Sequence, residues 1–188
     1  MTHAYWGPGQ SDNDLRSFVA SHKTDLSDQN CSIYQFDQDE ELVEAVARPI
    51  ADGKVIGWFQ GRMEFGPRAL GSRSILADPR DPEMNAKVNN AVKFREWWRP
   101  FAPSFKKEAA GEFLESATDS PFMILTAQVR PAKRSVIPSV THVAGSARPQ
   151  TVEREINPRY WRLIDEFGKR PGVPVIMTTC FNFRGGAS

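Results

Sequence analysis

Apolar runs with the length of strands alternate along this chain with segments of helical periodicity, and this alternation limits the possible folds most strongly. Strand-forming runs span four to eight residues, whereas helices repeat apolar residues three and four positions apart. Because the two patterns interleave, a layered α/β sheet is favoured over a helical bundle or a β-sandwich. Strands are predicted at 33–36, 54–59, 74–77, 122–129 and 173–179, and helices at 11–21, 37–52, 81–92 and 158–169.

Local signals predict where these helices begin and end. Ser11 is an N-cap candidate, because serine accepts hydrogen bonds from the free N–H groups of the first turn. Gly53 stands where a glycine commonly ends a helix. Pro49 lacks a backbone donor and predicts an earlier end or a distortion. The polar residues 22–30 are predicted to form a loop.

Composition restricts the class of protein. The chain has 188 residues, of which 40% are hydrophobic and 25% charged, and this suits one domain with its own core. The net charge of +1 disfavours a broadly basic RNA-binding protein. Cys31 and Cys180 are too few for a disulfide framework and match no common zinc spacing. Neither a signal peptide nor a bilayer-length apolar run is evident, so we expect a cytoplasmic protein that does not bind membranes.

A loop rich in glycine and arginine follows the predicted strand 54–59. Arg62, Arg68 and Arg73 are interleaved with glycines there. Glycine lets a backbone approach a ligand closely, and the guanidinium fork matches phosphate or carboxylate oxygens. Loops at strand ends are also where α/β sheets usually bind ligands. The loop therefore predicts a site for a small polyanion such as a nucleotide; the alternative is that the arginines form surface salt bridges.

Positive charge is concentrated in the middle of the chain. Between positions 62 and 106 there are nine basic and five acidic residues. Lys93 and Arg95 stand two positions apart at a predicted helix end, and they would point the same way if the backbone is extended there. They would then clamp one anion. The alternative is that they interact with the C-terminal end of the helix dipole.

Other side chains beside these clusters offer further candidates. Trp97, Trp98 and Phe101 could stack a nucleotide base, although aromatic residues next to prolines are more often part of a core. The hydroxyls and amide within 178–182 stand at the end of a predicted strand and could hold phosphate oxygens. His142 is a candidate general base or ligand partner, with a structural role as the alternative.

One long motif carries a family resemblance. The sequence GRMEFGPRALGSRSIL at 61–76 resembles the hallmark of the C-terminal domain of the O-carbamoyltransferases, which include the nodulation-factor, tobramycin and cephamycin enzymes. The resemblance spans nearly the whole chain, and it predicts a lead-in over 1–30 and a domain over 31–188 that stops short of its usual Gly-Glu-Pro continuation. Its further segments are YWGP at 5–8, KFR at 93–95, RPFAP at 99–103, THV at 141–143, Arg148, QTV at 150–152 and the stretch 174–185.

The resemblance implies a fold and a reaction. The fold is YrdC-like, an α/β domain with a twisted open sheet and flanking helices around a basic cavity. The reaction uses carbamoyl phosphate and ATP, with Mg²⁺, to form carbamoyl-adenylate while pyrophosphate and phosphate are released. A second, N-terminal domain with a histidine-bound metal, absent from this chain, would then pass the carbamoyl group to a hydroxyl acceptor.

The resemblance also assigns site residues. In YrdC-type synthases a Lys-x-Arg and a Ser-x-Asn element hold the nucleotide; the first matches Lys93 and Arg95, and the second falls on Cys180 and Asn182, with cysteine in place of serine. The thiol is a weaker hydrogen-bonding group than a hydroxyl, and Thr178 stands where the family usually has asparagine. The expected catalytic residues are Arg62, Arg68, Arg73, Lys93 and Arg95. The expected nucleotide-binding residues are Lys93, Arg95, Ser104, His142, Arg148, Thr179, Cys180 and Asn182.

Three hypotheses follow from these patterns. The first is an enzyme module that forms carbamoyl-adenylate. The second is a non-catalytic module that keeps the nucleotide cavity, and the third is an RNA-binding domain. A closed pocket of positive charge would favour the enzyme, whereas an open basic stripe and steeply salt-dependent binding would favour RNA.

Overall fold

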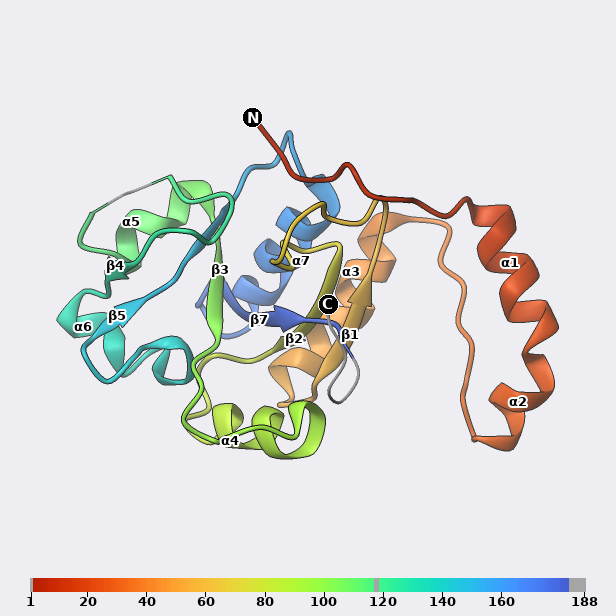
Figure 1. The fold of residues 1–188 in the computed structure, drawn as a ribbon, viewed down its shortest axis with the longest axis horizontal. Coiled ribbons are helices and arrows are strands. Elements are labelled where there is room, and N and C mark those ends of the chain that lie inside the picture. Colours follow the sequence, from red (N-terminus) through yellow and green to blue (C-terminus); the bar gives the residue numbers. More distant parts are fainter. Residues whose placement is uncertain (1, 117–118, 183–188) are drawn as a thin grey trace.

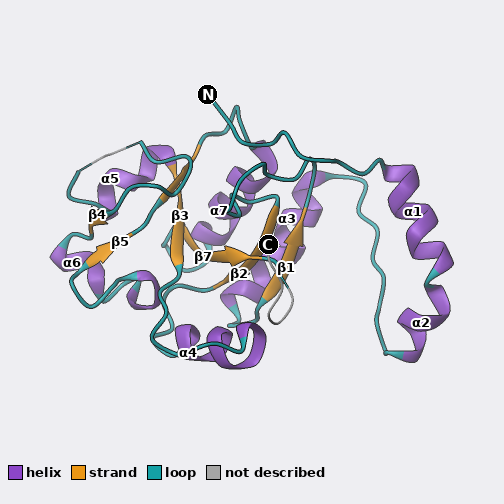
Figure 2. Cartoon of the chain, viewed as in Figure 1, coloured by secondary structure: helices purple, strands orange, loops and turns teal. Residues whose placement is uncertain are grey.

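The computed structural model describes residues 2–116 and 119–182, and it confirms the α/β class (Figures 1 and 2). Its main sheet has five strands in the order β1-β2-β7-β3-β6. All neighbouring strands are antiparallel except β3 and β6, which are parallel. The strands are β1 (Ile56–Phe59), β2 (Arg73–Ala77), β3 (Ala102–Lys106), β6 (Gln150–Val152) and β7 (Val175–Cys180).

Two helices, α3 (Asp39–Ala51) and α7 (Pro158–Lys169), pack together against one face of this sheet. Helix α7 begins as its sequence predicts, because the Asn157 side chain accepts a hydrogen bond from the Tyr160 N–H at 3.2 Å. Tyr160 and Ile164 are fully buried against Ile176 of β7. Removing this apolar surface from water stabilises the layer.

Shorter elements cover the opposite face. Phe105 of β3 is fully buried there and packs on Phe113, with ring centroids 5.5 Å apart. The elements on this side are α4 (Met84–Val88), the π-helix η1 (Asn89–Lys93), the 3₁₀-helices η2 (Lys107–Ala109) and η3 (Pro138–Val140), α5 (Ala110–Phe113), α6 (Pro131–Arg134), and a small sheet of β4 (Ala127–Gln128) and β5 (Ser146–Ala147).

The N-terminal region forms a hairpin that stands away from the sheet (Figure 1). It contains α1 (Asp12–Ser21) and α2 (Lys23–Asp28). Ser11 caps α1 as predicted, because its hydroxyl accepts from the Asp14 N–H and the Asp14 carboxylate accepts from the Ser11 N–H. Residues 3–9 precede α1 and run along the body of the domain, where Gly9 pairs with Arg62 in a single antiparallel bridge.

Several predicted elements are wrong or incomplete. The expected strand at 33–36 is absent, because no strand among the described residues lies beside it to pair with its backbone, and Tyr34 is 77% exposed. A short helix, α2, replaces the loop predicted at 22–30. Of the strand predicted at 122–129, only 127–128 is in strand conformation. The strand predicted at 54–59 forms over 56–59, at the edge of the sheet, and only Trp58 in it is buried.

Helix α3 confirms the prediction for 37–52, and it continues through Pro49 to Ala51. Gly53 then takes a positive φ of 77° and leaves the helix, as a glycine at that position can. Within the described residues, no helix combines the length and apolarity that spanning a bilayer requires.

Candidate functional site

A cavity of about 450 Å³ opens beyond the ends of the strands on one side of the main sheet. Strand β7 finishes on this side. Its antiparallel neighbours β2 and β3 begin there, and so does β6, which runs parallel to β3. Loops from distant parts of the sequence therefore meet at one place. They contribute five cationic side chains and, among the described lining residues, no carboxylate: the cations are Arg68, Lys93, Arg95, Arg99 and Arg148.

The backbone around Phe94 places Lys93 and Arg95 together, although it is not extended there as the sequence analysis supposed. Helix α4 continues as the π-helix η1, and Phe94 ends it in the left-handed conformation with φ of 50°. π-helical turns are frequent at functional sites. The tight turn brings the side chains on both sides of Phe94 to the same cavity.

Hydrogen bonds fix both cations at the cavity wall. The Lys93 ammonium donates to the Cys180 carbonyl at 2.8 Å and to the Asn182 side-chain oxygen. The Arg95 Nε donates to the Asn89 side-chain oxygen at 2.6 Å, and its guanidinium lies 4.8 Å from the centre of the Phe101 ring. Such contacts hold a flexible side chain in one orientation before a ligand arrives.

Asn89 organises this loop, and the sequence analysis did not identify it. It is fully buried. Its amide nitrogen donates to the carbonyls of Trp97 and Arg99 at 3.1 and 3.0 Å, while its oxygen accepts from Arg95. The buried Asn89 side chain thus links the start of η1 to the loop 95–99, which carries Arg95 and Arg99.

The positive charges are close enough to perturb one another. Burial, followed by the charge of Arg95, lowers the pKa of Lys93. Burial also lowers the pKa of Arg95, with the charge of Arg99 as the next cause, and that of Arg148, with Arg68 as the next. A cavity that crowds partly buried cations gains stabilisation when an anion enters, because the anion favours the charged forms.

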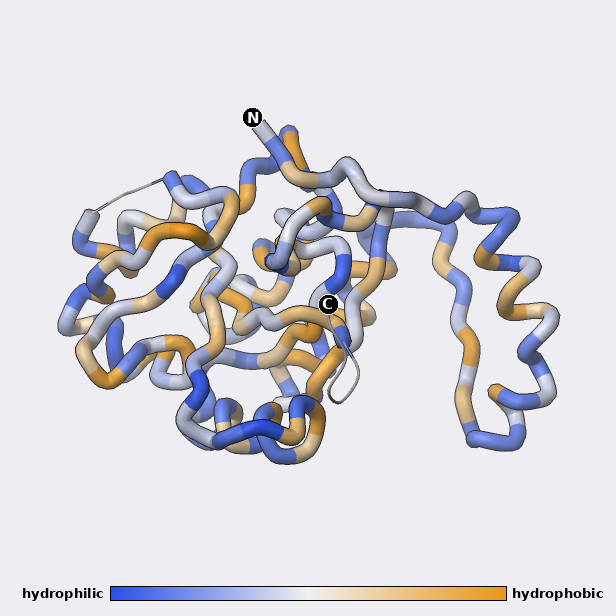
Figure 3. The backbone as a smooth tube through the Cα atoms, in the orientation of Figure 1, coloured by the Kyte–Doolittle hydropathy of each residue, from blue (hydrophilic) through white to orange (hydrophobic). Residues whose placement is uncertain are grey.

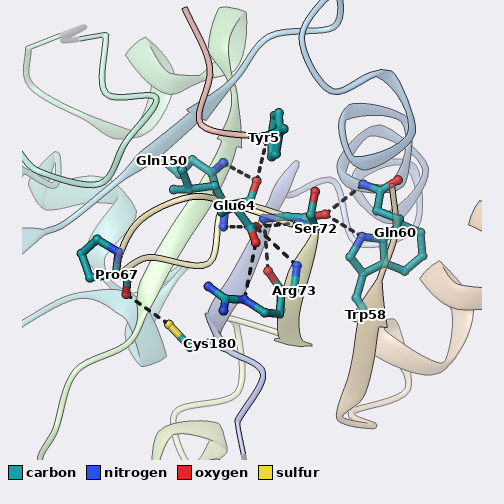
Figure 4. A network of polar contacts seen from close by, with 12 residues as sticks. Tyr5, Trp58, Gln60, Glu64, Pro67, Ser72, Arg73, Gln150 and Cys180 are labelled. Carbon is teal, nitrogen blue, oxygen red and sulfur yellow. Dashed lines mark hydrogen bonds and ion pairs between the residues drawn. The ribbon is translucent and has the colours of Figure 1, made fainter. Parts of the chain in front are cut away.

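Glu64 lies at the centre of a network of polar contacts (Figure 4) that organises the second loop, residues 60–72. It is 5% exposed, and its Oε1 accepts hydrogen bonds from the backbone N–H groups of Leu70, Ser72 and Arg73 at 2.6, 2.8 and 3.3 Å. Its Oε2 faces the Arg73 Nε at 3.6 Å. The Leu70 carbonyl also accepts from the Gln150 amide and the Tyr5 hydroxyl, at 2.8 and 2.9 Å.

We expect Glu64→Gln to lower the free energy of unfolding by about 3 kcal/mol, because it leaves the Arg73 charge buried without its counter-charge. Urea denaturation measures this change. The matched control is Glu96→Gln, since Glu96 and Arg99 form an ion pair of 2.9 Å in which both side chains are about half exposed. That substitution is expected to change stability by less than about 0.5 kcal/mol, and equal losses in the two variants would contradict the assignment.

Three residues predicted for the site lie elsewhere. Arg62 holds the lead-in, with Nε donating to the Gly7 carbonyl at 2.9 Å and Nη2 to the Trp6 carbonyl at 3.1 Å. Ser104 is fully buried and donates to the Gln150 side chain at 2.9 Å. His142 lies beside the cavity, where burial and the charge of Arg148 lower its pKa.

The remaining predicted residues lie at or behind the cavity wall. Arg73 is 8% exposed and pairs with Glu64, so it supports the wall and does not line it. The side chains predicted from the sequence that do line the cavity are Arg68, Lys93, Arg95, Arg148, Thr179, Cys180 and Asn182. Arg99 also lines the cavity; it lies in the RPFAP segment at 99–103 but was not among the predicted site residues.

The aromatic candidates separate into two groups. Phe101 also lines the cationic cavity, but it is only 2% exposed and the Arg95 guanidinium lies 4.8 Å from its ring centre, so its ring is not open to a base. Trp97 and Trp98 are 68% and 62% exposed, and they line a neighbouring groove of about 530 Å³ together with His142. Pro100 lines both this groove and the cationic cavity, so the two are adjacent.

Comparison with known proteins gives consistent matches. The family model described as carbamoyltransferase C-terminus matches residues 47–187. Nodulation protein NolNO of Sinorhizobium fredii is 45% identical over 97% of this chain and 26% of its own length. Nodulation protein NolO of Bradyrhizobium diazoefficiens is 43% identical over 97% of this chain and 32% of its own length. The 3'-hydroxymethylcephem-O-carbamoyltransferase of Streptomyces clavuligerus is 40% identical over 75% of this chain and 26% of its own length. The chain spans about a quarter to a third of the length of these relatives.

Proposed function

Because the chain belongs to the carbamoyltransferase C-terminal family, we propose that its cationic cavity binds ATP and carbamoyl phosphate and forms carbamoyl-adenylate. The transfer of the carbamoyl group to a hydroxyl is assigned to the part of such enzymes that this chain does not contain. The name of the cephem O-carbamoyltransferase describes that kind of overall reaction.

The observation that carries the proposal is the convergence of five cationic side chains on one cavity without a carboxylate among its described lining residues. ATP and carbamoyl phosphate are both small polyanions. An RNA-binding surface would instead spread its positive charge along a stripe, as broadly basic nucleic-acid-binding domains do. The convergence into one pocket therefore favours a small ligand over RNA.

The proposed reaction has two steps. Water cleaves carbamoyl phosphate, so that phosphate leaves and carbamate remains. A carbamate oxygen then attacks the α-phosphorus of ATP, a new P–O bond forms, and the bond to pyrophosphate breaks with its electron pair going to pyrophosphate. Charge develops on the phosphate oxygens and on the leaving group, and fixed cations can stabilise both.

The positions of the cations suit these roles. Lys93 and Arg95 are held by Cys180, Asn182 and Asn89, so they meet a phosphate in fixed orientations. Arg68 and Arg148 come from other loops of the same cavity. The Thr179 hydroxyl and the Cys180 thiol lie at the end of β7, where the family resemblance places a nucleotide contact.

Mg²⁺ would accompany the nucleotide. Among residues 2–116 and 119–182 no group of three or more His, Cys, Asp or Glu side chains is placed to hold a metal ion. Mg²⁺ is commonly bound through substrate phosphates together with waters and one or two carboxylates. The described cavity residues include no carboxylate and do not fit a resident Mg²⁺ site, so the ion would enter as part of Mg-ATP.

Product analysis tests the proposal. The chain is incubated with ATP and carbamoyl phosphate, and the nucleotide products are separated by chromatography. Pyrophosphate and an AMP derivative that require carbamoyl phosphate are expected, whereas ADP and phosphate alone would contradict the mechanism. Arg68→Ala is expected to reduce product formation at least tenfold, and the matched Arg62→Ala to leave it nearly unchanged, because only Arg68 lines the cavity.

The lowered pKa of Lys93 predicts a pH dependence. The Lys93 ammonium loses its proton at a lower pH than the ammonium of an exposed lysine. The affinity for pyrophosphate should therefore be highest below this pKa and fall as pH rises through it. Titration calorimetry between neutral pH and pH 10 measures the fall. In Lys93→Arg the guanidinium stays charged, so the fall should move to higher pH; identical profiles for the two proteins would contradict the assignment.

A further inference from the structure

The N-terminal hairpin leaves its apolar side chains uncovered. Neither α1 nor α2 contains a buried residue. Leu15 of α1 is 48% exposed, and Ile33 and Tyr34 of the following extended segment are 53% and 77% exposed. Figure 3 shows hydrophobic residues along both α1 and this segment. Single exposed apolar residues are ordinary, but a group of them marks an interaction site.

These side chains line a groove of about 650 Å³. Leu15 and Val19, one helical turn apart in α1, form one wall, and Ile33, Tyr34 and Phe36 contribute to the other. Residues four apart lie on the same face of a helix. The hairpin stands off from the sheet (Figure 1), so within the described residues nothing fills the groove.

The hairpin helices are too short to be stable unaided. They have ten and six residues, whereas isolated helices below about 12–15 residues are marginal in water. Most helical stability in proteins comes from packing an amphipathic face. The uncovered apolar face of the hairpin is therefore expected to pack against a partner.

The relatives indicate which partner this is. NolNO and NolO each match 97% of this chain, a stretch too long to leave out the hairpin. Yet the matched parts are only 26% and 32% of those proteins. The matched family model is the C-terminal part of a carbamoyltransferase. Most of a complete enzyme of this family thus lies outside the segment described here.

We propose that the groove between α1 and residues 33–36 docks the remaining, N-terminal part of the carbamoyltransferase. This inference rests on the family assignment that also underlies the proposed function. An apolar helix face in a groove is a common mode of association, and the uncovered side chains supply the apolar surface for it.

Residues 6–9 connect the hairpin to the loop that carries Arg68. Arg62 binds the carbonyls of Trp6 and Gly7. Two backbone hydrogen bonds, each of 2.9 Å, join the same two segments. The Gly7 N–H donates to the Met63 carbonyl, and the Met63 N–H donates to the Pro8 carbonyl. Residues 6–9 therefore run from α1 directly to the loop that carries Arg68. A partner docked on the hairpin would therefore be tied, through residues 6–9, to the loop that carries Arg68.

Hydrogen exchange tests the proposal in a full-length protein. The matched segment of NolNO is replaced by this chain, and exchange of peptides 12–21 and 33–36 is compared between the full-length chimera and the chain alone. We expect at least tenfold slower exchange in the chimera. Peptides from α7 and β7 report in every sample that the body is folded.

Matched variants locate the contact. In the chimera, Leu15→Lys with Val19→Lys is expected to abolish the protection of 12–21, and so is Tyr34→Lys from the opposite wall, a change that spares the helix. Ser17→Lys adds a charge to α1 away from the groove lining and is expected to preserve the protection.

Three outcomes would overturn the proposal. One is equally fast exchange in the chimera and in the chain alone. Another is protection that survives the groove variants. The third is protection in the chain alone that disappears on dilution, which would assign the groove to a second copy. Carbamoyl-phosphate-dependent product formation is measured on the same chain alone, so failure of the proposed function is seen separately from failure of docking.

Discussion

Lys93→Ala is expected to weaken pyrophosphate binding by about 100-fold, a change of about 2.7 kcal/mol. The ammonium is partly buried in a cavity of like charges and is anchored to the Cys180 carbonyl and the Asn182 side chain. Truncating one member of a buried, hydrogen-bonded charge pair typically costs about 2–5 kcal/mol of binding free energy. The anion would also lose one of the cations whose charge it neutralises.

Titration calorimetry with pyrophosphate measures this loss. Lys54→Ala is the matched control, because Lys54 is exposed and lies outside the cavity. Its affinity should equal that of the unmodified chain. A loss of less than about threefold for Lys93→Ala would remove Lys93 from the binding site.

Gly71→Ala is expected to destabilise the fold by about 4 kcal/mol, because it adds backbone strain and overpacking. Gly71 has a φ of 98°, and a Cβ there would lie 2.2 Å from Cδ1 of the fully buried Tyr160. The Gly71 carbonyl also accepts hydrogen bonds from the side chains of Trp58 and Gln60, each at 2.9 Å, so the backbone cannot move freely away.

Gly61→Ala separates strain from overpacking in the same loop. Gly61 has a φ of 57°, but a Cβ there meets nothing within 4 Å. The expected loss is about 1–2 kcal/mol, the cost of the left-handed region for a residue with a side chain. Urea denaturation compares the two variants. Losses of equal size would show that the contact with Tyr160 has no energetic weight.

Much of the fold could be predicted from local patterns. Helix α7 has the predicted bounds, since Asn157 and Pro158 mark its start and its apolar residues repeat with helical spacing. Strands β2 and β7 also lie close to the predicted ranges. In these segments local preference and tertiary packing agree.

Strand β3 could not be predicted, because it contains Pro103 and follows a run that resembles a loop. Proline cannot donate a ladder hydrogen bond and is rare inside sheets, yet Pro103 stands opposite Met177 of β7. Strand β6 has only three residues and forms by pairing with β3. Both strands depend on partners far away in the sequence.

Most of the cations that line the candidate site could be predicted from the sequence, but not the contacts that orient each side chain. Arg68, Lys93, Arg95 and Arg148 meet at one cavity, as clustered basic residues and the family resemblance indicated. The direction of Arg62 depends on its contacts with the lead-in, which no local pattern encodes.

The residues that position the loops were missed for a related reason. Asn89 and Glu64 act through hydrogen bonds to backbone groups, and sequence alone does not reveal those partners. The available signal for Glu64 was that it is the one carboxylate within the glycine- and arginine-rich segment 61–73. Buried polar groups need such partners, since leaving them unsatisfied costs free energy.

ATP–pyrophosphate exchange tests the central claim most directly. Labelled pyrophosphate is incubated with the chain and ATP, with and without carbamoyl phosphate, and incorporation of the label into ATP is followed. We predict exchange that requires carbamoyl phosphate and disappears in Arg68→Ala, because reversal of adenylate formation is the step that returns pyrophosphate to ATP. Absence of exchange in a chain that still binds ATP would contradict adenylate formation in this cavity.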